Sequence, residues 1–233
     1  MNLDEKIAAF FQDPSIDPQT LLHPGQNLFG NLYLLRRDIE RAFSKEAKWL
    51  GVMGIMAGFD LLAKLYAGTD ENSVTERFEN FVSKYVTNNN ATETDVIYQL
   101  RNSLLHSFGL YSKRYVRKRD RATAGYDRQD YLFRLLGDPA ATPGALVTLT
   151  TSQPIKKLAA GTPDEIEVMI TEYDIDIYAL KTAFNTAVQS YQKDLVEHHN
   201  ATLRSNFDVQ QVKDEWPFFD MYCRTFIEAR AAK

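Results

Sequence analysis

The sequence predicts a mainly α-helical protein with a small antiparallel β insertion. Apolar residues recur at spacings of three and four over most of the 233 residues, which is the period of an amphipathic helix. The region at about 128–172 instead holds short β-branched or alternating segments between turns rich in Gly and Pro, as a hairpin or small sheet does. No repeat or low-complexity linker divides the sequence, so we expect a single domain over residues 1–233.

The composition is that of a globular protein whose core needs no cross-links, with 44% hydrophobic and 25% charged residues. Cys223 is the single cysteine, which excludes an internal disulfide and a thiolate metal site and favours a reducing cytoplasm. A net charge of −4 argues against a protein that coats nucleic acid over its whole surface, but allows a local basic patch. Residues 1–11 lack the pattern of a signal peptide, so we expect no export.

Helices are expected throughout the N-terminal part. A short first helix begins near Asn2 and ends at the prolines within 13–25. The pattern is then helical over about 28–67, with a bend near Ser44 and an end at Gly68. Glycine is the common residue just after a helix because it adopts the left-handed conformation without strain.

The segment at 49–59 is the most apolar of the chain. Charged residues flank it, and it is shorter than the roughly 20 residues of a membrane helix, so we expect a buried helix. Gly51, Gly54 and Gly58 line one strip of it and allow another helix to approach closely. Packing within the chain is the favoured interpretation, and a contact between subunits is the alternative.

Two more helices are expected before residue 109. Ser73 and Glu76 have the spacing of a capping box, and the helix that they begin ends at the asparagines 88–90. Thr92 or Thr94 is expected to cap the next helix. Its apolar side, which we expect to be buried, consists of Ile97, Leu100, Leu104 and Phe108.

The remaining chain alternates strands and helix. Segments at 130–136, 145–151 and 165–171 are expected to form two or three strands of a small antiparallel sheet. Residues 175–198 form the longest amphipathic pattern of the sequence, with apolar residues at 180, 184, 188, 191 and 195. An aromatic segment at 216–226 is expected to pack against the bundle.

The stretch YQLRNSLLHSF, residues 98–108, has a polar side beside its apolar one. At about 100° per residue, Gln99, Asn102 and His106 follow one another along the helix, and Arg101 lies next to them. Such a side suggests a surface that meets a polar partner. The ordinary alternative is that the arginine pairs with an acid and the histidine lies at a helix end.

The motif Arg-Asn-x-x-x-His at Arg101–His106 resembles the signature of the HEPN superfamily (higher eukaryotes and prokaryotes nucleotide-binding). That signature is an arginine, a polar residue, three to five further residues and a histidine. The upstream helix GIMAGFDLLAKLYAG and a hairpin insertion after the motif also resemble uncharacterised bacterial members. The likeness covers about residues 47–111 and, in general layout only, about 128–198. It implies a HEPN-like helical bundle.

The resemblance also implies an activity. Many members are metal-independent endoribonucleases, often toxins or defence effectors, whose site forms where the motif helices of two subunits meet. Arg101 and His106 would then be catalytic and Asn102 their polar helper. The resemblance implies a homodimer through the motif helix and RNA as substrate. The sequence identifies no antitoxin or other protein partner and predicts no membrane contact.

The residue types suit this chemistry. A neutral imidazole can take a proton from an RNA 2′-OH, the oxygen then attacks the adjacent phosphate, and a guanidinium holds the phosphoryl oxygens. Positions 101 and 106 are about 140° apart around a helix, so we expect two motif helices in a dimer to be needed to aim both at one phosphate. The alternative function is a non-catalytic HEPN-like module that binds a nucleotide, RNA or a protein partner.

Other residues are candidates for supporting roles. Asp60 and Gln99 could support the motif, although a pair between Asp60 and Lys64 is the simpler interpretation for the aspartate. The sequence has no Walker loop, dinucleotide fingerprint or metal-ligand pattern, so we expect no cofactor and no metal. A basic and aromatic run after the motif suggests contact with RNA phosphates and bases, and equally a solvated arm. The run consists of Lys113, Arg114, Tyr115, Arg117, Lys118, Arg119 and Arg121.

Overall fold

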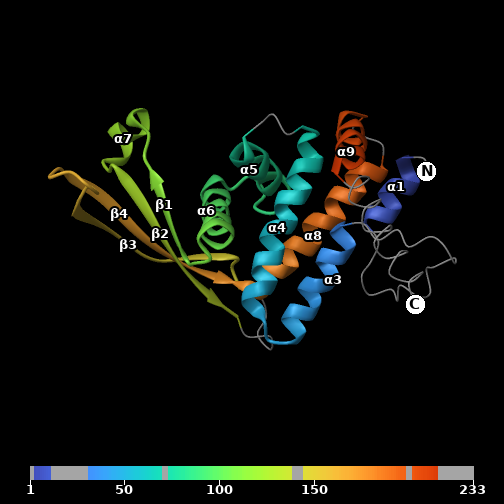
Figure 1. Cartoon of the computed structure of the whole chain (residues 1–233), viewed down its shortest axis with the longest axis horizontal. Helices are drawn as coiled ribbons and strands as arrows, with labels where there is room; N and C mark the ends of the chain where they lie inside the picture. Colours follow the sequence, from blue (N-terminus) through green and yellow to red (C-terminus); the bar gives the residue numbers. More distant parts are fainter. Residues whose placement is uncertain (1–2, 12–30, 70–72, 138–143, 198–200, 215–233) are drawn as a thin grey trace, which may run out of the picture. The chain divides into compact units, whose positions relative to one another are not determined.

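The computed structural model of this chain describes residues 3–11, 31–69, 73–137, 144–197 and 201–214. The chain forms two compact units, and each is described by itself (Figure 1). The helical unit comprises Met1–Val86 and Phe184–Lys233, and the mixed unit comprises Thr87–Ala183. The boundary at residue 184 falls within one helix.

The helical unit contains the helices that periodicity predicts and one further helix, Ala201–Asp214, that was not predicted. The expected bend near Ser44 is a break, where Glu46 has a φ of 61°. Gly68 ends a helix in the left-handed conformation with φ 69°, and Ser73 Oγ accepts a hydrogen bond of 3.1 Å from the Glu76 N–H, both as predicted. The elements are α1 (Leu3–Phe10), α3 (Asn31–Ser44), α4 (Lys48–Ala67), α5 (Val74–Tyr85), α9 (Ala201–Asp214) and the greater part of α8 (Ile177–Val196).

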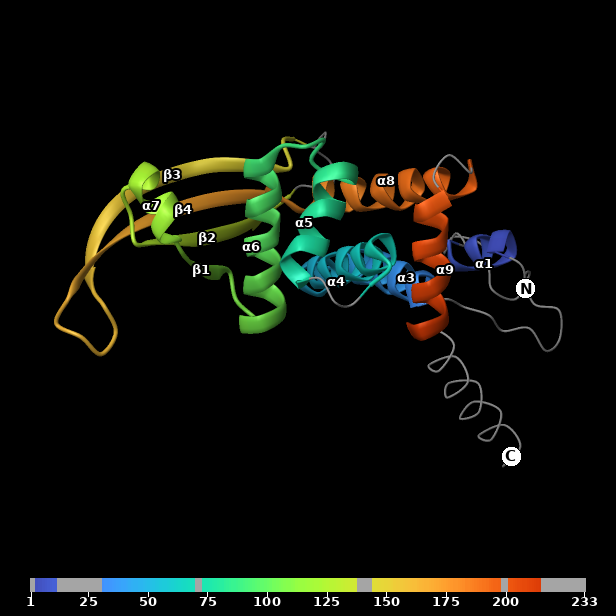
Figure 2. The same cartoon turned by 90° about the horizontal axis from the view of Figure 1, so that it is seen from above.

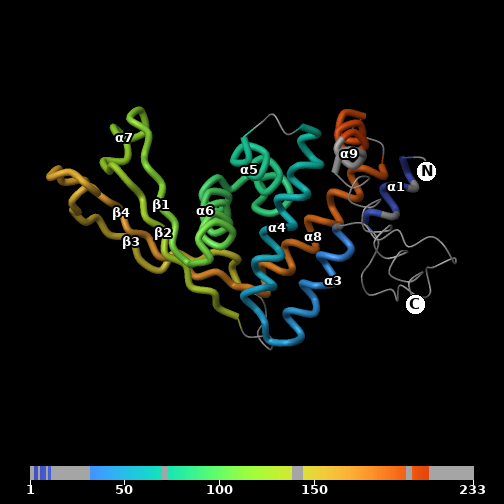
Figure 3. Tube along the Cα trace, in the orientation of Figure 1, coloured from blue at the N-terminus to red at the C-terminus, as the bar shows by residue number. Residues whose placement is uncertain are grey.

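Helices α3 and α4 lie side by side because small residues on α4 leave room for α3 (Figure 3). A Cβ atom added at Gly51 would lie 2.5 Å from the Phe43 ring. One added at Gly54 would lie 2.8 Å from Ile39 Cγ1. One added at Gly58 would lie 2.6 Å from the Phe184 ring on α8. The glycine strip therefore serves packing within the chain, as favoured from the sequence.

Helix α4 is long and apolar enough, by length and composition, to cross a membrane. Half of its most apolar window is buried inside the protein, as in the core helix of a folded bundle. Its fully buried side chains include Val52, Ile55, Met56 and Phe59. The prediction of a buried helix at 49–59 is confirmed.

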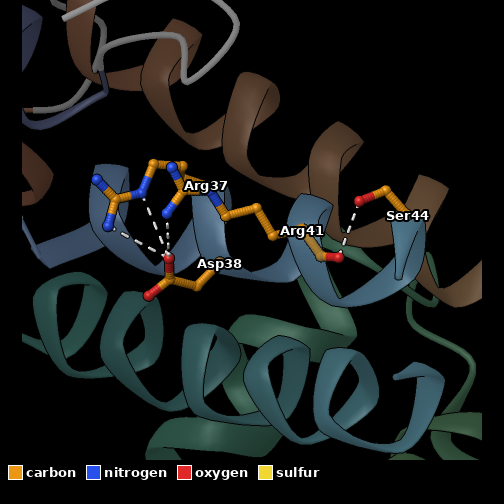
Figure 4. A network of polar contacts seen from close by, with 4 residues as sticks. All are labelled: Arg37, Asp38, Arg41 and Ser44. Atoms are coloured by element: carbon orange, nitrogen blue, oxygen red, sulfur yellow. Dashed lines mark hydrogen bonds and ion pairs between the residues drawn. The ribbon is translucent and has the colours of Figure 1, made fainter. Parts of the chain in front are cut away.

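The outer side of α3 carries charges (Figure 4). Asp38 Oδ1 lies 3.3 Å from Arg37 Nη2 and 3.8 Å from Arg41 Nη1, and Ser44 Oγ donates a 2.9 Å hydrogen bond to the Arg41 carbonyl. Exposed ion pairs of this kind stabilise a helix by at most about 1 kcal/mol. Packing on α4 is therefore the main reason that α3 stays in place.

The mixed unit corrects the predicted fold class. It contains a four-stranded sheet of order β1-β2-β4-β3, in which β2 and β4 are parallel and the other two pairs are antiparallel. The chain is α+β, and the expectation of a mainly α protein with a small antiparallel insertion at about 128–172 is wrong. The elements are α6 (Ala91–Ser107), β1 (Tyr111–Tyr115), α7 (Lys118–Ala124), β2 (Arg128–Leu136), β3 (Val147–Leu158) and β4 (Glu165–Asp176).

Two features of the sequence hid this sheet. Strand β1 lies in the basic run, where charged residues masked the alternation. Strands β3 and β4 form a hairpin of two twelve-residue strands, which runs on past the ends of β1 and β2 (Figure 2). In the sheet, β4 lies between β2 and β3. Alternation shows where strands lie, but not which edges pair.

One face of the sheet carries an aromatic ladder. Tyr131 lies 6.3 Å from Phe133 and 6.1 Å from Tyr173 between ring centroids, with nearly parallel planes. All three residues are buried. Cross-strand aromatic pairs are among the stronger stabilising pairs of a sheet. The ladder therefore holds β2 and β4 together at the centre of the sheet.

Strand β4 passes into α8 without a loop because Asp176 caps the helix. Its Oδ1 accepts hydrogen bonds from the Tyr178 and Ala179 N–H groups, at 2.9 and 3.0 Å. The predicted apolar side of α8 is confirmed, because Leu180, Phe184, Val188, Tyr191 and Leu195 are all buried. The aromatic segment at 216–226 lies outside the described residues.

Candidate functional site

The motif helix, α6, begins at Asn90. The Asn90 side chain accepts a 3.2 Å hydrogen bond from the Glu93 N–H, so the expectation that Thr92 or Thr94 caps the helix is wrong. Thr94 lies inside the helix, where its hydroxyl donates to the Asn90 carbonyl at 2.8 Å. The asparagine takes the cap because its backbone is extended, with φ −76° and ψ 101°.

The sides of α6 agree only in part with the prediction. Ile97, Leu100 and Leu104 are buried as expected. Phe108 was expected to be buried with them, but 73% of it is exposed, because the helix ends at residue 107. Gln99 is buried instead of lying on an exposed polar side. Its Oε1 accepts a 2.8 Å hydrogen bond from a hydroxyl on β1, which explains the burial.

The three motif side chains are in contact within one chain. Arg101 Nη1 lies 3.0 Å from Asn102 Oδ1 and 2.7 Å from His106 Nε2. The arginine is buried, the asparagine is half-buried and the histidine is exposed. The separation of about 140° around the helix does not keep Arg101 and His106 apart, because a long arginine side chain reaches along the helix surface. A second helix is not needed to bring the two groups together.

The contact between Arg101 and His106 restricts which ring nitrogen can accept. A guanidinium has five N–H donors and no acceptor, so the 2.7 Å contact is a hydrogen bond when His106 Nε2 is the acceptor and the ring hydrogen is on Nδ1. The Nε2 lone pair becomes available to a substrate proton once the guanidinium turns to another acceptor.

Polar contacts fix α6 to the sheet. Asp95 accepts a 2.6 Å hydrogen bond from the Tyr131 hydroxyl and lies 3.0 Å from Arg114 Nη1. Burial, followed by the charge of Asp95, raises the pKa of Tyr131, so the hydroxyl remains a donor. A further bond joins Ser112 to Gln99. The motif residues therefore stand on a helix that is held at several points along β1 and β2.

The two predicted supporting residues belong to different units. Gln99 ties α6 to β1, and its support of the motif stays a prediction. Asp60 lies on α4, in the helical unit. Its predicted role in support of the motif is likewise untested.

The structure divides the basic run. Lys113 and Tyr115 point to one face of β1, and Arg114 points to the other, where it pairs with an aspartate of α6. Arg121 forms an ion pair with Asp127. The residues that follow β1 form the short exposed helix α7. All seven side chains of the run are exposed to solvent, Arg114 and Arg121 included, and contact with RNA stays a prediction for each of them.

An ionic cluster on the sheet was missed from the sequence. Asp130 is fully buried and accepts hydrogen bonds from the Tyr111 hydroxyl at 2.6 Å and from Arg128 Nη2 at 2.7 Å. Burial, together with this bond to Asp130, raises the pKa of Tyr111 to about 12. The sequence signal is an aspartate directly before the apolar residues of a strand. The cluster fixes β1 to β2 on the face opposite α6.

Within the described ranges, no three His, Cys, Asp or Glu side chains gather to hold a metal ion. Comparison of the chain with models of protein families, with curated proteins and with solved structures gives no match.

Proposed function

We propose that this chain is a metal-independent endoribonuclease of HEPN type that acts on single-stranded RNA in the cytoplasm. One observation supports this most strongly. The Arg101 guanidinium contacts both Asn102 and His106, and the histidine is exposed at the end of a fixed helix. This arrangement offers a proton acceptor next to a permanently charged phosphate ligand.

The reaction begins when an RNA phosphate binds the Arg101 guanidinium in place of the imidazole. Asn102 Oδ1 accepts from Nη1 and keeps the guanidinium oriented. His106 Nε2 then takes the proton of the 2′-OH, and the 2′ oxygen bonds to phosphorus. The bond from phosphorus to the 5′ oxygen breaks, and that oxygen takes up a proton from solvent. The products are a 2′,3′-cyclic phosphate and a 5′-hydroxyl.

Arg101 stabilises the charge that develops on the phosphoryl oxygens, because its planar fork donates two parallel hydrogen bonds. The proposal includes a homodimer through α6 and a role as a toxin or defence effector, and both rest on the resemblance alone. Sedimentation velocity tests the dimer. A monomer at micromolar concentration would remove this part of the proposal.

The test of the activity is cleavage of labelled single-stranded RNA in excess chelator. His106→Ala removes the proton acceptor and should lower the rate about 10²-fold to 10⁴-fold. Arg101→Lys should be nearly as inactive, because a lysine lacks the planar fork. Asn102→Ala should have a milder effect. Ser107→Ala, which changes the exposed neighbour of the histidine, is the matched control and should leave the rate unchanged.

Equal residual cleavage by the wild type and His106→Ala would reject the enzyme. The non-catalytic module that binds a nucleotide, RNA or a protein would then be preferred. Burial of Arg101 favours that second function, because its contacts with Asn102 and His106 could serve α6 as a purely structural pair.

A further inference from the structure

We infer that the Phe108 ring stacks on a nucleobase of the RNA next to the scissile phosphate. This inference rests on the proposed function and names a further residue of that site. Phe108 follows His106 by two residues and directly precedes the turn into β1. It is 73% exposed, whereas Ile97, Leu100 and Leu104 on the apolar side of the same helix are buried.

The backbone of Phe108 is unfavourable by itself. Its φ of 47° and ψ of 38° lie in the left-handed region, where a bulky side chain is a rare outlier. Glycine is the usual residue at this position of a helix end. Gly109 follows immediately but has no positive φ. The chain therefore places a phenylalanine, and not the neighbouring glycine, in the conformation that glycine favours. Backbone strain of this kind concentrates at functional sites.

Two hydrogen bonds hold this conformation. The Phe108 N–H and the Gly109 N–H both donate to the Ser103 carbonyl, the latter at 3.0 Å. The ring is thus attached to a fixed backbone at the end of α6. A fixed, exposed aromatic side chain loses little conformational entropy when a flat ligand stacks on it.

The electrostatics at this end of α6 select a base over a phosphate. The C-terminus of a helix carries partial negative charge on its last carbonyl groups. The N–H edge of a base is a suitable donor to these carbonyls, whereas a phosphate binds near this end only through the positive charge of Arg101. The Arg101 Cα lies about two turns before Phe108, and its guanidinium reaches along the helix to His106. The base of a nucleotide would therefore bind at Phe108 and its phosphate at Arg101.

A second copy of this chain is the other occupant to consider. A stable interface buries about 800 Å² on each partner around an apolar centre. Along α6 and its cap, Phe108 is the one exposed large apolar side chain that the structure describes. Its neighbours His106 and Ser107 are exposed and polar. A single aromatic ring in polar surroundings fits a base better than the centre of a protein interface, so the homodimer proposed through α6 would not be centred on Phe108.

The experiment measures the affinity of a fluorescent single-stranded oligoribonucleotide in the His106→Ala background, which binds without cleavage. Phe108→Ala should weaken binding on the order of 10-fold to 100-fold. Phe108→Trp should restore it. Phe108→Leu should behave as Phe108→Ala, because it keeps the apolar character but has no aromatic face. An oligonucleotide with one abasic position next to the cleavage site should bind the phenylalanine and alanine proteins equally.

The outcomes separate the two proposals. If the wild type cleaves RNA and Phe108→Ala binds and cleaves as well as Phe108, the stacking inference is wrong and the enzyme stands. If the wild type cleaves nothing but Phe108→Ala still weakens RNA binding and Phe108→Trp restores it, stacking stands and the enzyme fails. If Phe108→Ala changes the sedimentation coefficient from dimer to monomer without a change in RNA affinity per chain, the ring belongs to a contact between copies and the inference is overturned.

Discussion

The C-terminal ends of α4 and α6 have the same backbone conformation but opposite residues. Gly68 ends α4 with φ 69° and ψ 11°, and Phe108 ends α6 with φ 47° and ψ 38°. For a residue with a Cβ atom the left-handed conformation costs about 1–2 kcal/mol. The end of α4 avoids this cost, whereas the end of α6 does not.

The surroundings explain the difference. Gly68 faces α9, where a Cβ atom would lie 2.5 Å from Asn206, so only glycine fits. Phe108 extends into solvent, so nothing in the fold requires its ring. Packing therefore determines the residue at the end of α4, and we infer that a ligand determines the residue at the end of α6. Gly68→Ala and Phe108→Gly test this contrast directly, and substitutions at Asp176 and Asn90 compare it with the starts of two helices.

Gly68→Ala should have the largest effect, a decrease of about 2–4 kcal/mol in the free energy of unfolding. The strained backbone and the close contact with Asn206 add together. Gly125→Ala is the matched control, because its φ is 73° but nothing lies within 4 Å of the added atom. It should cost only about 1 kcal/mol. Urea denaturation measures the stability of both variants. Equal losses of stability would mean that Asn206 moves away from the added Cβ atom at little cost.

Asp176→Ala should come next, with a loss of about 1–2 kcal/mol, because α8 loses the side chain that caps its first turn. Asp176→Asn should lose less, since an amide oxygen also accepts. An alanine variant as stable as the wild type would show that packing alone holds the start of α8.

The same cap predicts a pH dependence. Burial would raise the pKa of Asp176, but hydrogen bonds from the Ala179, Gly144 and Tyr178 N–H groups outweigh it and leave the pKa below its usual value. A carboxyl with a lowered folded pKa stabilises the fold at every pH above its unfolded pKa of about 4. This stabilisation is lost as the pH falls from there through the lower pKa of the folded state. Between pH 5 and pH 2, Asp176→Asn should therefore lose less stability than the wild type in urea titrations.

Asn90→Ala should remove about 1 kcal/mol, because it deletes the side-chain bond that begins α6. Asn90→Asp keeps an acceptor and serves as the control. Thermal unfolding followed by circular dichroism measures both. Equal melting temperatures for the wild type and both variants would mean that tertiary contacts, and not the Asn90 cap, stabilise the start of α6.

Phe108→Gly should have the smallest effect on stability, a gain of at most about 1 kcal/mol. Relief of the left-handed strain is partly offset by the greater freedom of glycine in the unfolded chain. A gain in stability together with a loss of RNA affinity would show that Phe108, unlike Gly68, serves binding and not the fold. A clear loss of stability would show that the ring packs on the fold after all.

Sequence periodicity predicted most of the helices, although not α7 or α9, and it predicted the sheet poorly, for a physical reason. The positions 180, 184, 188, 191 and 195 identify α8 because helical spacing depends only on neighbours along the chain. The pairing of β2 with β4 depends on residues about forty positions apart, such as Arg128 and Val168, and alternation contains no record of the partner.

The candidate site was found by its residue types but not by its geometry. Ideal helix angles place positions 101 and 106 apart, and they omit the length and flexibility of the arginine side chain that closes the 2.7 Å contact. Phe108 was assigned to the apolar side by the same periodicity. The helix ends one residue earlier, which no regular spacing reveals.

The position of β4 between β2 and β3 affects how the sheet forms during translation. Once residue 136 has left the ribosome, β1 and β2 can form a hairpin, but one edge of β2 has no strand to pair with until β4 has been synthesised some thirty to forty residues later. Translation proceeds at about 5–20 residues per second, so that edge stays open for about two to eight seconds. During this interval the nascent sheet is exposed to the wrong strands, including those of neighbouring chains on the same messenger.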